Sequence, residues 1–254
     1  MGSKTKIDWC DASWNPVTGC YHDCPYCYAR GIANRFGTPP KGNPHRNIFE
    51  ADKPVRKAAM PGTIGAINPY PHGFQPTFHR YKLDEPGNWK TPKSIFVCSM
   101  ADLFGDWVPL EWIQAVFDAC KRVPRHNYIF LTKNPGRYVS LMQLGVLPTE
   151  SNFWYGSTAT TPDTTFFFCK AVNTFISIEP IHAPFSDLGN KDCFVDWVIV
   201  GAETGRRKGK IIPKKRWIDE LAANCDRCNT PIFMKESLKT IMGADFRQEF
   251  PWDR

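Results

Sequence analysis

A stretch of twelve residues, Gly19–Arg30, constrains this chain more than any other part of its sequence. It reads G-C-Y-H-D-C-P-Y-C-Y-A-R and places three cysteines, Cys20, Cys24 and Cys27, within eight positions as C-x3-C-x2-C. An odd number of cysteines in so short a run does not suit a set of disulfides. Three thiolates from one loop indicate a metal site instead, because soft thiolate sulfur binds iron and zinc.

The number of cysteines bears on which metal the loop would hold. A tetrahedral zinc site or an ordinary [4Fe–4S] cluster uses a fourth protein ligand. His22 and Cys10 are the candidates nearby, and neither falls at a familiar spacing. A cluster held by three cysteines leaves one iron open to a substrate or cofactor. The residues are therefore compatible with an iron–sulfur site and with a zinc site.

Composition narrows the class of protein. A chain of 254 residues, 42% hydrophobic, has room for one large α/β domain or two small ones. No apolar run approaches the roughly 18 residues of a membrane span, and Met1–Lys6 contains no apolar signal region. We therefore expect a cytoplasmic protein that does not enter a membrane. The ten cysteines then indicate reduced thiols and metal chemistry, and the net charge of +7 favours an anionic partner.

Residues Gly37–Lys93 differ in composition from the rest of the chain. They hold 10 of the 22 prolines, which excludes long helices and central strands. They also hold six aromatic residues and nine Lys or Arg against four Asp or Glu, so they contribute +5 to the net charge. Disordered linkers rarely carry so many aromatic residues. We expect an ordered insertion that is either a lid or substrate platform, where bases could stack and phosphates pair, or a solvated loop.

The remainder alternates short apolar runs with helical patterns. Tyr28, Ile32 and Phe36 stand four apart and predict a helix. This βα alternation, repeated six or seven times, predicts a parallel sheet within a partial or near-complete (β/α) barrel, and we treat residues 1–254 as a single domain. The expected strands are 14–18, 94–98, 127–131, 152–155, 174–178, 196–200 and 231–234, and the expected helices are 28–36, 106–123, 137–144, 163–172 and 215–223.

Polar residues follow six of the expected strands. The carboxyl ends of the strands in a (β/α) barrel form one face, and that face carries the active site. A set of polar residues at these ends therefore predicts a site, and the alternative for each single residue is a structural cap. The residues are Asp102, Lys133, Ser157, Glu179, Glu203 and Lys235.

The cysteine pattern, with Tyr26 directly before the third cysteine, resembles the signature of the radical S-adenosylmethionine (SAM) enzymes. In that family three cysteines hold a [4Fe–4S] cluster, and the open iron chelates the amino and carboxylate groups of SAM. One electron from the cluster cleaves SAM to methionine and a 5′-deoxyadenosyl radical, which abstracts hydrogen from the substrate. The resemblance also implies a radical-SAM type of barrel and an electron donor such as flavodoxin or ferredoxin.

The resemblance extends along nearly the whole chain, towards a small phage-associated family that is radical-SAM-like and has no assigned activity. It is carried by W-N-P-V-T-G-C from Trp14, S-M-A-D-L-F from Ser99, and four further motifs. By position, it implies that Ser99 and Asp102 lie near the amino group of SAM. It places Ser157 and Glu179 near the ribose or carboxylate, and Tyr26 beside the cofactor. The further motifs are L-T-K at 131–133, S-I-E-P at 177–180, D-W-V-I-V-G-A-E-T-G at 196–205 and Q-E-F-P at 248–251.

Two other features have both a functional and a structural interpretation. Cys225 and Cys228 form a second C-x2-C pair, which with Cys10 or Cys193 would suit an auxiliary metal; the other interpretation is structural thiols. Seven of the eleven residues at 206–216 are basic, which suits either phosphate contact or a solvated loop. We expect Lys133, Glu203, Arg206, Arg207 and Lys235 to contact an anionic substrate.

The sequence thus favours a radical SAM enzyme with a [4Fe–4S] cluster and SAM as cofactors. Its basic charge and its insertion favour a nucleobase, a nucleotide or a modified DNA base as substrate, with a small metabolite or peptide as the alternative. A zinc-containing nucleic-acid-binding protein without catalysis would use the same cysteines. A barrel that keeps the cluster for structural reasons and binds a partner protein is the third hypothesis.

Overall fold

The computed structural model describes residues 5–37, 47–185, 195–205 and 207–253. The chain separates into two compact units. Unit 1 comprises Met1–Lys4 and Cys10–Tyr128, and unit 2 comprises Thr5–Trp9 and Ile129–Arg254. Among the described helices, none combines the length and apolar composition that crossing a membrane requires.

The prediction of an α/β chain with a parallel sheet is confirmed. Seven strands are assigned to one sheet in the order β1-β5-β6-β7-β8-β9-β10. Within unit 1, β1 (Ala12–Trp14) pairs in parallel with β5 (Ser94–Val97). Within unit 2, β7 (Phe153–Ala159) pairs in parallel with β8 (Asn173–Ile178), β8 with β9 (Trp197–Val200), and β9 with β10 (Ile232–Met234). The remaining strand, β6 (Asn127–Thr132), contains the boundary between the units.

Unit 1 also has a small second sheet with the strand order β2-β4-β3. The strand β4 (Thr77–His79) runs antiparallel to β2 (Val17–Thr18) and parallel to β3 (Phe49–Ala51). Two strands of the proline-rich segment therefore add to a strand that leads into the cysteine loop. The helical elements of this unit are α1 (Tyr28–Phe36), η1 (Arg80–Lys82), η2 (Glu85–Asn88) and α2 (Leu110–Lys121).

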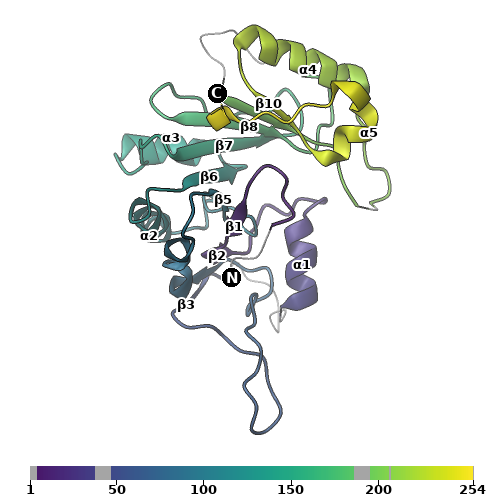
Figure 1. Ribbon diagram of the computed structural model, residues 1–254. Helices are drawn as coiled ribbons and strands as arrows, with labels where there is room; N and C mark the ends of the chain where they lie inside the picture. The colour runs from purple at the N-terminus through teal and green to yellow at the C-terminus, as the bar shows by residue number, and fades with distance from the viewer. Residues whose placement is uncertain (1–4, 38–46, 186–194, 206, 254) are drawn as a thin grey trace. The chain divides into compact units, whose positions relative to one another are not determined.

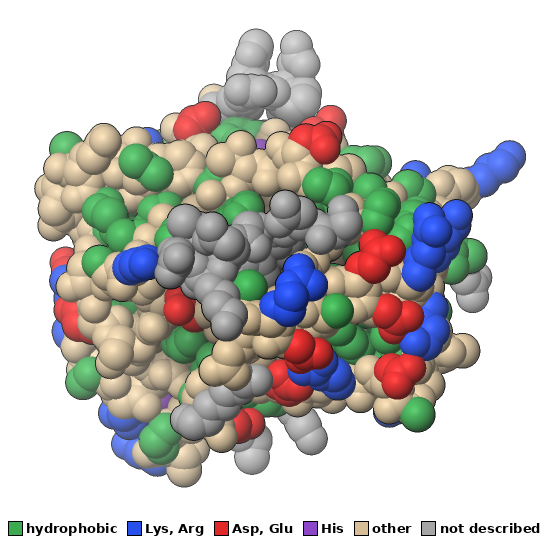
Figure 2. All heavy atoms as spheres, turned by 90° about the horizontal axis from the view of Figure 1, so that it is seen from above, with side chains coloured by type: hydrophobic (Ala, Val, Ile, Leu, Met, Phe, Trp, Pro, Cys, Tyr) green, Lys and Arg blue, Asp and Glu red, His purple; other side chains and the backbone are tan. Residues whose placement is uncertain are grey.

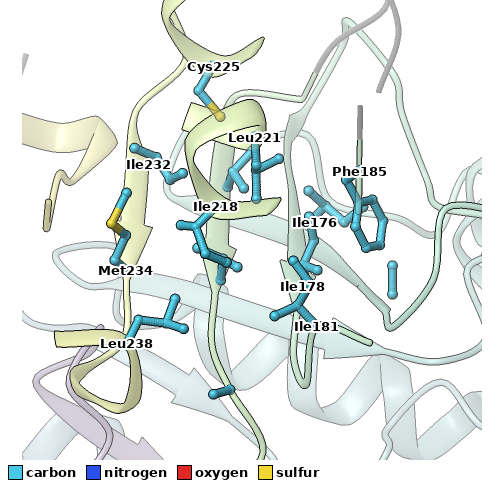
Figure 3. Close-up of a cluster of buried hydrophobic side chains, with 14 of the residues drawn as sticks. Ile176, Ile178, Ile181, Phe185, Ile218, Leu221, Cys225, Ile232, Met234 and Leu238 are labelled. Atoms are coloured by element: carbon cyan, nitrogen blue, oxygen red, sulfur yellow. The ribbon is translucent and has the colours of Figure 1, made fainter. Parts of the chain in front are cut away.

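In unit 2 the strands are buried almost throughout, on both faces of the sheet, as is usual for a parallel sheet. On one face Ile176, Val198 and Ile232 pack against Ile218 and Leu221 of α4 (Figure 3). The helical elements of this unit are α3 (Gly136–Gln143), α4 (Lys215–Cys228), η3 (Glu236–Leu238), α5 (Lys239–Met242), η4 (Gly243–Asp245) and η5 (Pro251–Asp253).

The opposite face of the same strands is lined by aromatic rings. Phe175 lies across Gly156 of the neighbouring strand, where an added Cβ would come within 2.1 Å of the ring. The Phe175 ring also packs against Trp197, with their centroids 5.7 Å apart. Trp9, which belongs to this unit although it is near the start of the chain, completes the cluster at 6.2 Å from Trp197.

Two sequence predictions about helices need correction, whereas the helix predicted at 28–36 is confirmed as α1. No helix forms at 163–172, because the Phe167 N–H donates to the Ser157 hydroxyl (2.9 Å) and not to a helical carbonyl. The helix predicted from Asp106 begins at Leu110. In α1 the periodic residues that indicate the helix are at least 37% exposed, and Ala29 and Ala33 are its buried face.

Candidate functional site

The cysteine loop begins at Gly19, at the end of β2. Gly19 has φ +88°, its N–H donates to the Met100 carbonyl (2.9 Å), and it forms a parallel bridge with Ala101. A Cβ at this position would lie 2.2 Å from the Gln75 carbonyl oxygen. The chain can therefore enter the loop in this conformation only with glycine.

The loop ends at the first turn of α1. Cys27 is the N-cap residue, and its Sγ accepts the Arg30 N–H (3.4 Å). The Cys27 N–H donates to the Cys24 carbonyl (3.2 Å), and the Cys20 Sγ accepts the His22 N–H (3.5 Å). Backbone N–H groups and a helix N-terminus both favour negative charge on sulfur. Backbone N–H groups therefore point at two of the three sulfurs.

The three sulfurs also influence one another electrostatically. Burial raises the pKa of the Cys20 thiol to about 12, and smaller effects come from the His22 N–H, which lowers it, and from the charges of Asp102, Cys24 and Cys27, which raise it. None of the three cysteines forms a disulfide, and all three are half-buried. A metal cation would replace the proton on Cys20, so binding would release protons.

The donor set fits a soft metal or an iron–sulfur cluster in its chemistry. As the side chains stand, however, no three His, Cys, Asp or Glu groups among the described residues are close enough to hold a metal ion. Cys20, Cys24 and Cys27 would therefore have to turn their side chains towards a common point. They belong to a loop and to a helix N-cap, and neither holds a thiol in a close-packed core.

His22, one possible fourth ligand, already has a partner. Its Nε2 lies 2.7 Å from the Oδ2 of Asp102, and the Asp102 Oδ1 accepts the Phe104 N–H (3.0 Å). The His22 ring meets the edge of Trp107 with centroids 4.9 Å apart. Asp102 is only 5% exposed, so this pair fastens the cysteine loop to the segment after β5. Cys10, the other candidate, is half-buried before β1.

Ser99 lies beside the same loop. Its carbonyl accepts the Tyr28 hydroxyl (2.7 Å), and its hydroxyl donates to the Asn15 Oδ1 (3.2 Å). The same Asn15 oxygen accepts the Met100 N–H (2.9 Å), so one side chain orders the backbone after β5. Unit 1 thus brings Ser99 and Asp102 next to the three cysteines, and Tyr26 is half-buried within the loop.

In unit 2, Glu179 and Lys235 follow β8 and β10 and form an ion pair. Gly201, after the intervening strand β9, permits this contact: a Cβ there would lie 2.9 Å from the Lys235 Cδ. The charge of Lys235 is therefore compensated in this structure, and its side chain is positioned by the neighbouring strand ends.

Glu203 forms the second charged cluster of unit 2. Arg207 donates to both of its carboxylate oxygens, at 2.5 and 2.6 Å, and the His182 Nε2 lies 3.8 Å from Oε2. The bonds from Arg207 lower the pKa of Glu203, against a smaller opposing effect of burial. The carboxylate is therefore ionised at neutral pH. Arg206 lies outside the described residues.

The other predicted residues of unit 2 differ in their surroundings. Ser157 is fully buried and its hydroxyl accepts the Phe167 N–H, so it caps a loop within the core. Lys133 is half-buried just after β6. Part of the basic run that continues from Arg207 forms ion pairs: Lys215 pairs with both Asp219 (2.7 Å) and Asp245 (2.8 Å). Basic and acidic side chains are interspersed on the face shown in Figure 2.

The C-x2-C pair near the end of α4 does not form a second metal site among the described residues. Cys225 is fully buried in the apolar core, and burial raises its pKa to about 12. Cys228 is half-buried, Cys10 belongs to unit 1, and Cys193 lies outside the described residues. The structure places Cys225 as a packed structural thiol.

One surface pocket of about 400 Å³ lies against α4 and α5 in unit 2. Its rim carboxylates are paired: Asp219 and Asp245 with Lys215, and Asp226 with Arg247. None of the residues predicted for the site lines it. The chemistry predicted from the sequence is therefore not located in this pocket.

Sequence reasoning missed Asn15 and Trp107 in unit 1 and His182 in unit 2. Asn15 belongs to the W-N-P-V-T-G-C motif, so that motif was the available signal for it. The contacts of Trp107 and His182 join positions 85 and 21 residues apart, from His22 to Trp107 and from His182 to Glu203. No local pattern indicates such pairs.

Comparisons with known proteins identify the family of the chain but indicate no activity. No curated protein and no solved structure matches the chain. Residues 4–240 match the model of a family described as a protein of unknown function (DUF5131), and the chain therefore belongs to that family.

Proposed function

We propose that this protein is a radical SAM enzyme whose [4Fe–4S] cluster is held by Cys20, Cys24 and Cys27. The observation that carries the proposal is the C-x3-C-x2-C loop at the start of α1. None of its three cysteines forms a disulfide, and two of the sulfurs accept backbone N–H groups. When bound, the cluster would supply the electron that cleaves SAM to methionine and a 5′-deoxyadenosyl radical.

The residues around the loop would hold it in place for that chemistry. Gly19 sets the entry of the chain, and Cys27 joins the exit to a helix. The His22–Asp102 pair fixes the middle of the loop to the segment after β5. Both Asp102 oxygens accept bonds, so its first role is to position the loop. A preorganised loop loses less conformational entropy when its cysteines bind a cofactor.

The contacts with SAM remain predictions of the resemblance. Ser99 and Asp102 are the candidates for its amino group, and Ser157 and Glu179 for its ribose or carboxylate. Ser157 would have to give up its bond to the Phe167 N–H to serve a ligand. The proposal also includes a radical-SAM type of barrel, an electron donor such as flavodoxin or ferredoxin, and a nucleobase or nucleotide substrate.

Anaerobic purification followed by iron and sulfide analysis tests the proposal. We expect about four irons per chain, as a [4Fe–4S] cluster requires, and 5′-deoxyadenosine after incubation with SAM and dithionite. Cys24→Ala should lose both. Cys169→Ala is the matched control, because Cys169 is an equally half-buried free thiol outside the loop, and it should keep both.

Three results would overturn this proposal. Zinc in place of iron under strictly anaerobic handling would favour the nucleic-acid-binding protein without catalysis. Iron that remains in Cys24→Ala at the level of Cys169→Ala would show that the loop does not hold the cluster. Iron without any reductive cleavage of SAM would favour a structural cluster.

A further inference from the structure

The segment between β3 and β4 contains a hairpin, residues Lys53–Asn68, called the arm below. Arg56 and Ile67 form an antiparallel bridge, the Lys57 N–H donates to the Ala66 carbonyl (2.9 Å), and the Asn68 N–H to the Val55 carbonyl (2.7 Å). Figure 1 shows this segment extending away from the rest of unit 1. The arm is thus a folded structure that projects from its unit.

The tip of the arm is shaped by its own sequence. The Thr63 N–H donates to the Met60 carbonyl (3.1 Å), with Pro61 and Gly62 at the two central positions and Gly62 at φ +81°. Pro followed by Gly is the sequence that a type II turn prefers. Further along, a Cβ at Gly65 would lie 1.9 Å from the Lys57 carbonyl oxygen, so the two sides of the arm approach closely. The turn and close approach form within the arm itself.

The arm exposes apolar side chains. Met60 is 80% and Ile64 82% exposed at the tip, and Val55 and Ile67 are 40% and 47% exposed lower down. Single exposed apolar residues are ordinary, but several together on one projecting element indicate a surface that a partner covers. Covering them would remove apolar area from water and favour binding.

The charge of the arm identifies the partner as anionic. Lys53, Arg56 and Lys57 are exposed, and the sequence from Lys53 to Leu83 contains no Asp or Glu. The preceding carboxylates, Glu50 and Asp52, both lie within ion-pair distance of Arg80, at 2.8 and 3.7 Å. Within the described part of unit 1, no ion pair joins the three cations of the arm to a carboxylate.

We propose that the arm binds double-stranded nucleic acid, with its cations on the phosphates and its aliphatic tip in a groove. Proteins that enter the minor groove use Arg and Lys on the backbone and insert Met, Ile or Pro as wedges. Membrane-surface segments carry Trp, Tyr or Phe at the interface, and residues 53–68 contain none of these. This inference depends on the proposed function in one respect: the bound duplex would contain the base on which the enzyme acts.

Salt-dependent binding to a fluorescently labelled DNA duplex tests the cations. The variant K53Q/R56Q/K57Q should bind more weakly, and the slope of log affinity against log salt should fall by about 2.7, or about 0.9 for each lost phosphate contact. The control K90Q/K170Q/K239Q removes the same charge from three exposed lysines elsewhere and should leave the slope nearly unchanged. Equal losses in the two variants would overturn the proposal, because they would reflect net charge alone.

A second pair of variants tests the tip. M60S/I64S should weaken duplex binding several-fold without changing the salt slope, because it removes apolar contact and no charge. The control L144S/I212S replaces two side chains that are 65% and 72% exposed elsewhere, and should bind as the original chain does. All four positions are exposed, so circular dichroism and the melting temperature should not change.

Two further outcomes would overturn the proposal. One is loss of binding to phosphatidylcholine–phosphatidylserine vesicles in M60S/I64S with duplex binding intact, which would assign the tip to a membrane. The other is loss of self-association in M60S/I64S with duplex binding intact, which would assign it to a second copy of the chain. Duplex binding should be the same in Cys24→Ala, so this proposal and the cluster proposal can fail separately.

Discussion

Gly19 is the residue on which the conformation of the cysteine loop depends most directly. Because a Cβ would collide with the Gln75 carbonyl at a positive φ, we expect Gly19→Ala to destabilise the protein by at least about 2 kcal/mol and to lower its metal content. Urea unfolding and metal analysis measure both effects.

Gly31 provides the control for that experiment. It lies in α1, and nothing stands within 4 Å of an added Cβ. Gly31→Ala should therefore raise the stability by about 0.5–1 kcal/mol, since alanine is the better helix former. If Gly19→Ala behaved like Gly31→Ala, the strained entry to the loop would not exist.

His79 makes the stability depend on pH. It is 1% exposed and bonded to the Thr18 hydroxyl (2.9 Å), and burial lowers its pKa to about 3, with smaller effects from Lys82 and His72. The unfolded chain takes up this proton near pH 6.5, so the neutral His79 contributes stability above that pH. This contribution should fall by about 2 kcal/mol between about pH 7.5 and 5.

Urea unfolding across this pH range measures the loss. The variant His79→Gln cannot titrate, so its stability should fall less steeply over the same interval, whatever its stability at neutral pH. Parallel curves for the two proteins would show that His79 is not held neutral in the folded state.

At the scale of elements, the Cys225 and Cys228 pair at the end of α4 is the candidate for a second metal site. Cys225 packs in the apolar core and has no close group of metal ligands among the described residues. The double variant Cys225→Ala, Cys228→Ala should therefore keep the metal content of the original chain and lose a little stability from the small cavity. Metal analysis of the purified variant checks this, and a drop of one metal or more would contradict it.

Six of the seven expected strands form as β5 to β10, but the expected strand 14–18 is wrong, because this stretch divides into the end of β1 and β2, which belong to different sheets. The runs 95–98 and 197–200 are continuously apolar, and β5 and β9 are buried along their whole length. The helix predicted at 163–172 was wrong because Ser157, on another element, takes the Phe167 N–H. The helix predicted to end at residue 223 continues to Cys228, where Asn229 caps it at φ +54°. An asparagine after a helix is a known stop signal that could have been used.

The candidate site was predictable only where its residues are close in sequence. The spacing of Cys20, Cys24 and Cys27 is visible in one loop, and so is the start of α1. The pairing of His22 with Asp102 joins positions 80 residues apart and depends on how β5 lies beside the loop. The partners of Glu179 and Glu203 likewise follow from neighbouring strand ends and a loop. Residue types could be named from the sequence, but the bonds they make could not.

At the scale of the whole molecule, we expect Trp9 to stabilise unit 2 more than unit 1. It is 2% exposed and packs on Trp197 and Phe175, so Trp9→Ala should cost roughly 3–5 kcal/mol. Hydrogen exchange should show protection lost in β8 and β9 before β4. Trp14→Ala, a fully buried tryptophan of unit 1, should give the opposite order. Loss confined to unit 1 in Trp9→Ala would contradict the assignment.

The membership of Thr5–Trp9 in unit 2 has a consequence for how the chain is made. Trp9 leaves the ribosome early, whereas its ring partners Phe175 and Trp197 follow 166 and 188 residues later. At a synthesis rate of roughly 5–20 residues per second, the Trp9 ring is made on the order of ten seconds or more before the rings that it packs against. Unit 1 can complete its own sequence during that interval. The first part of unit 2 to be synthesised is thus among the last parts of the protein to find its place.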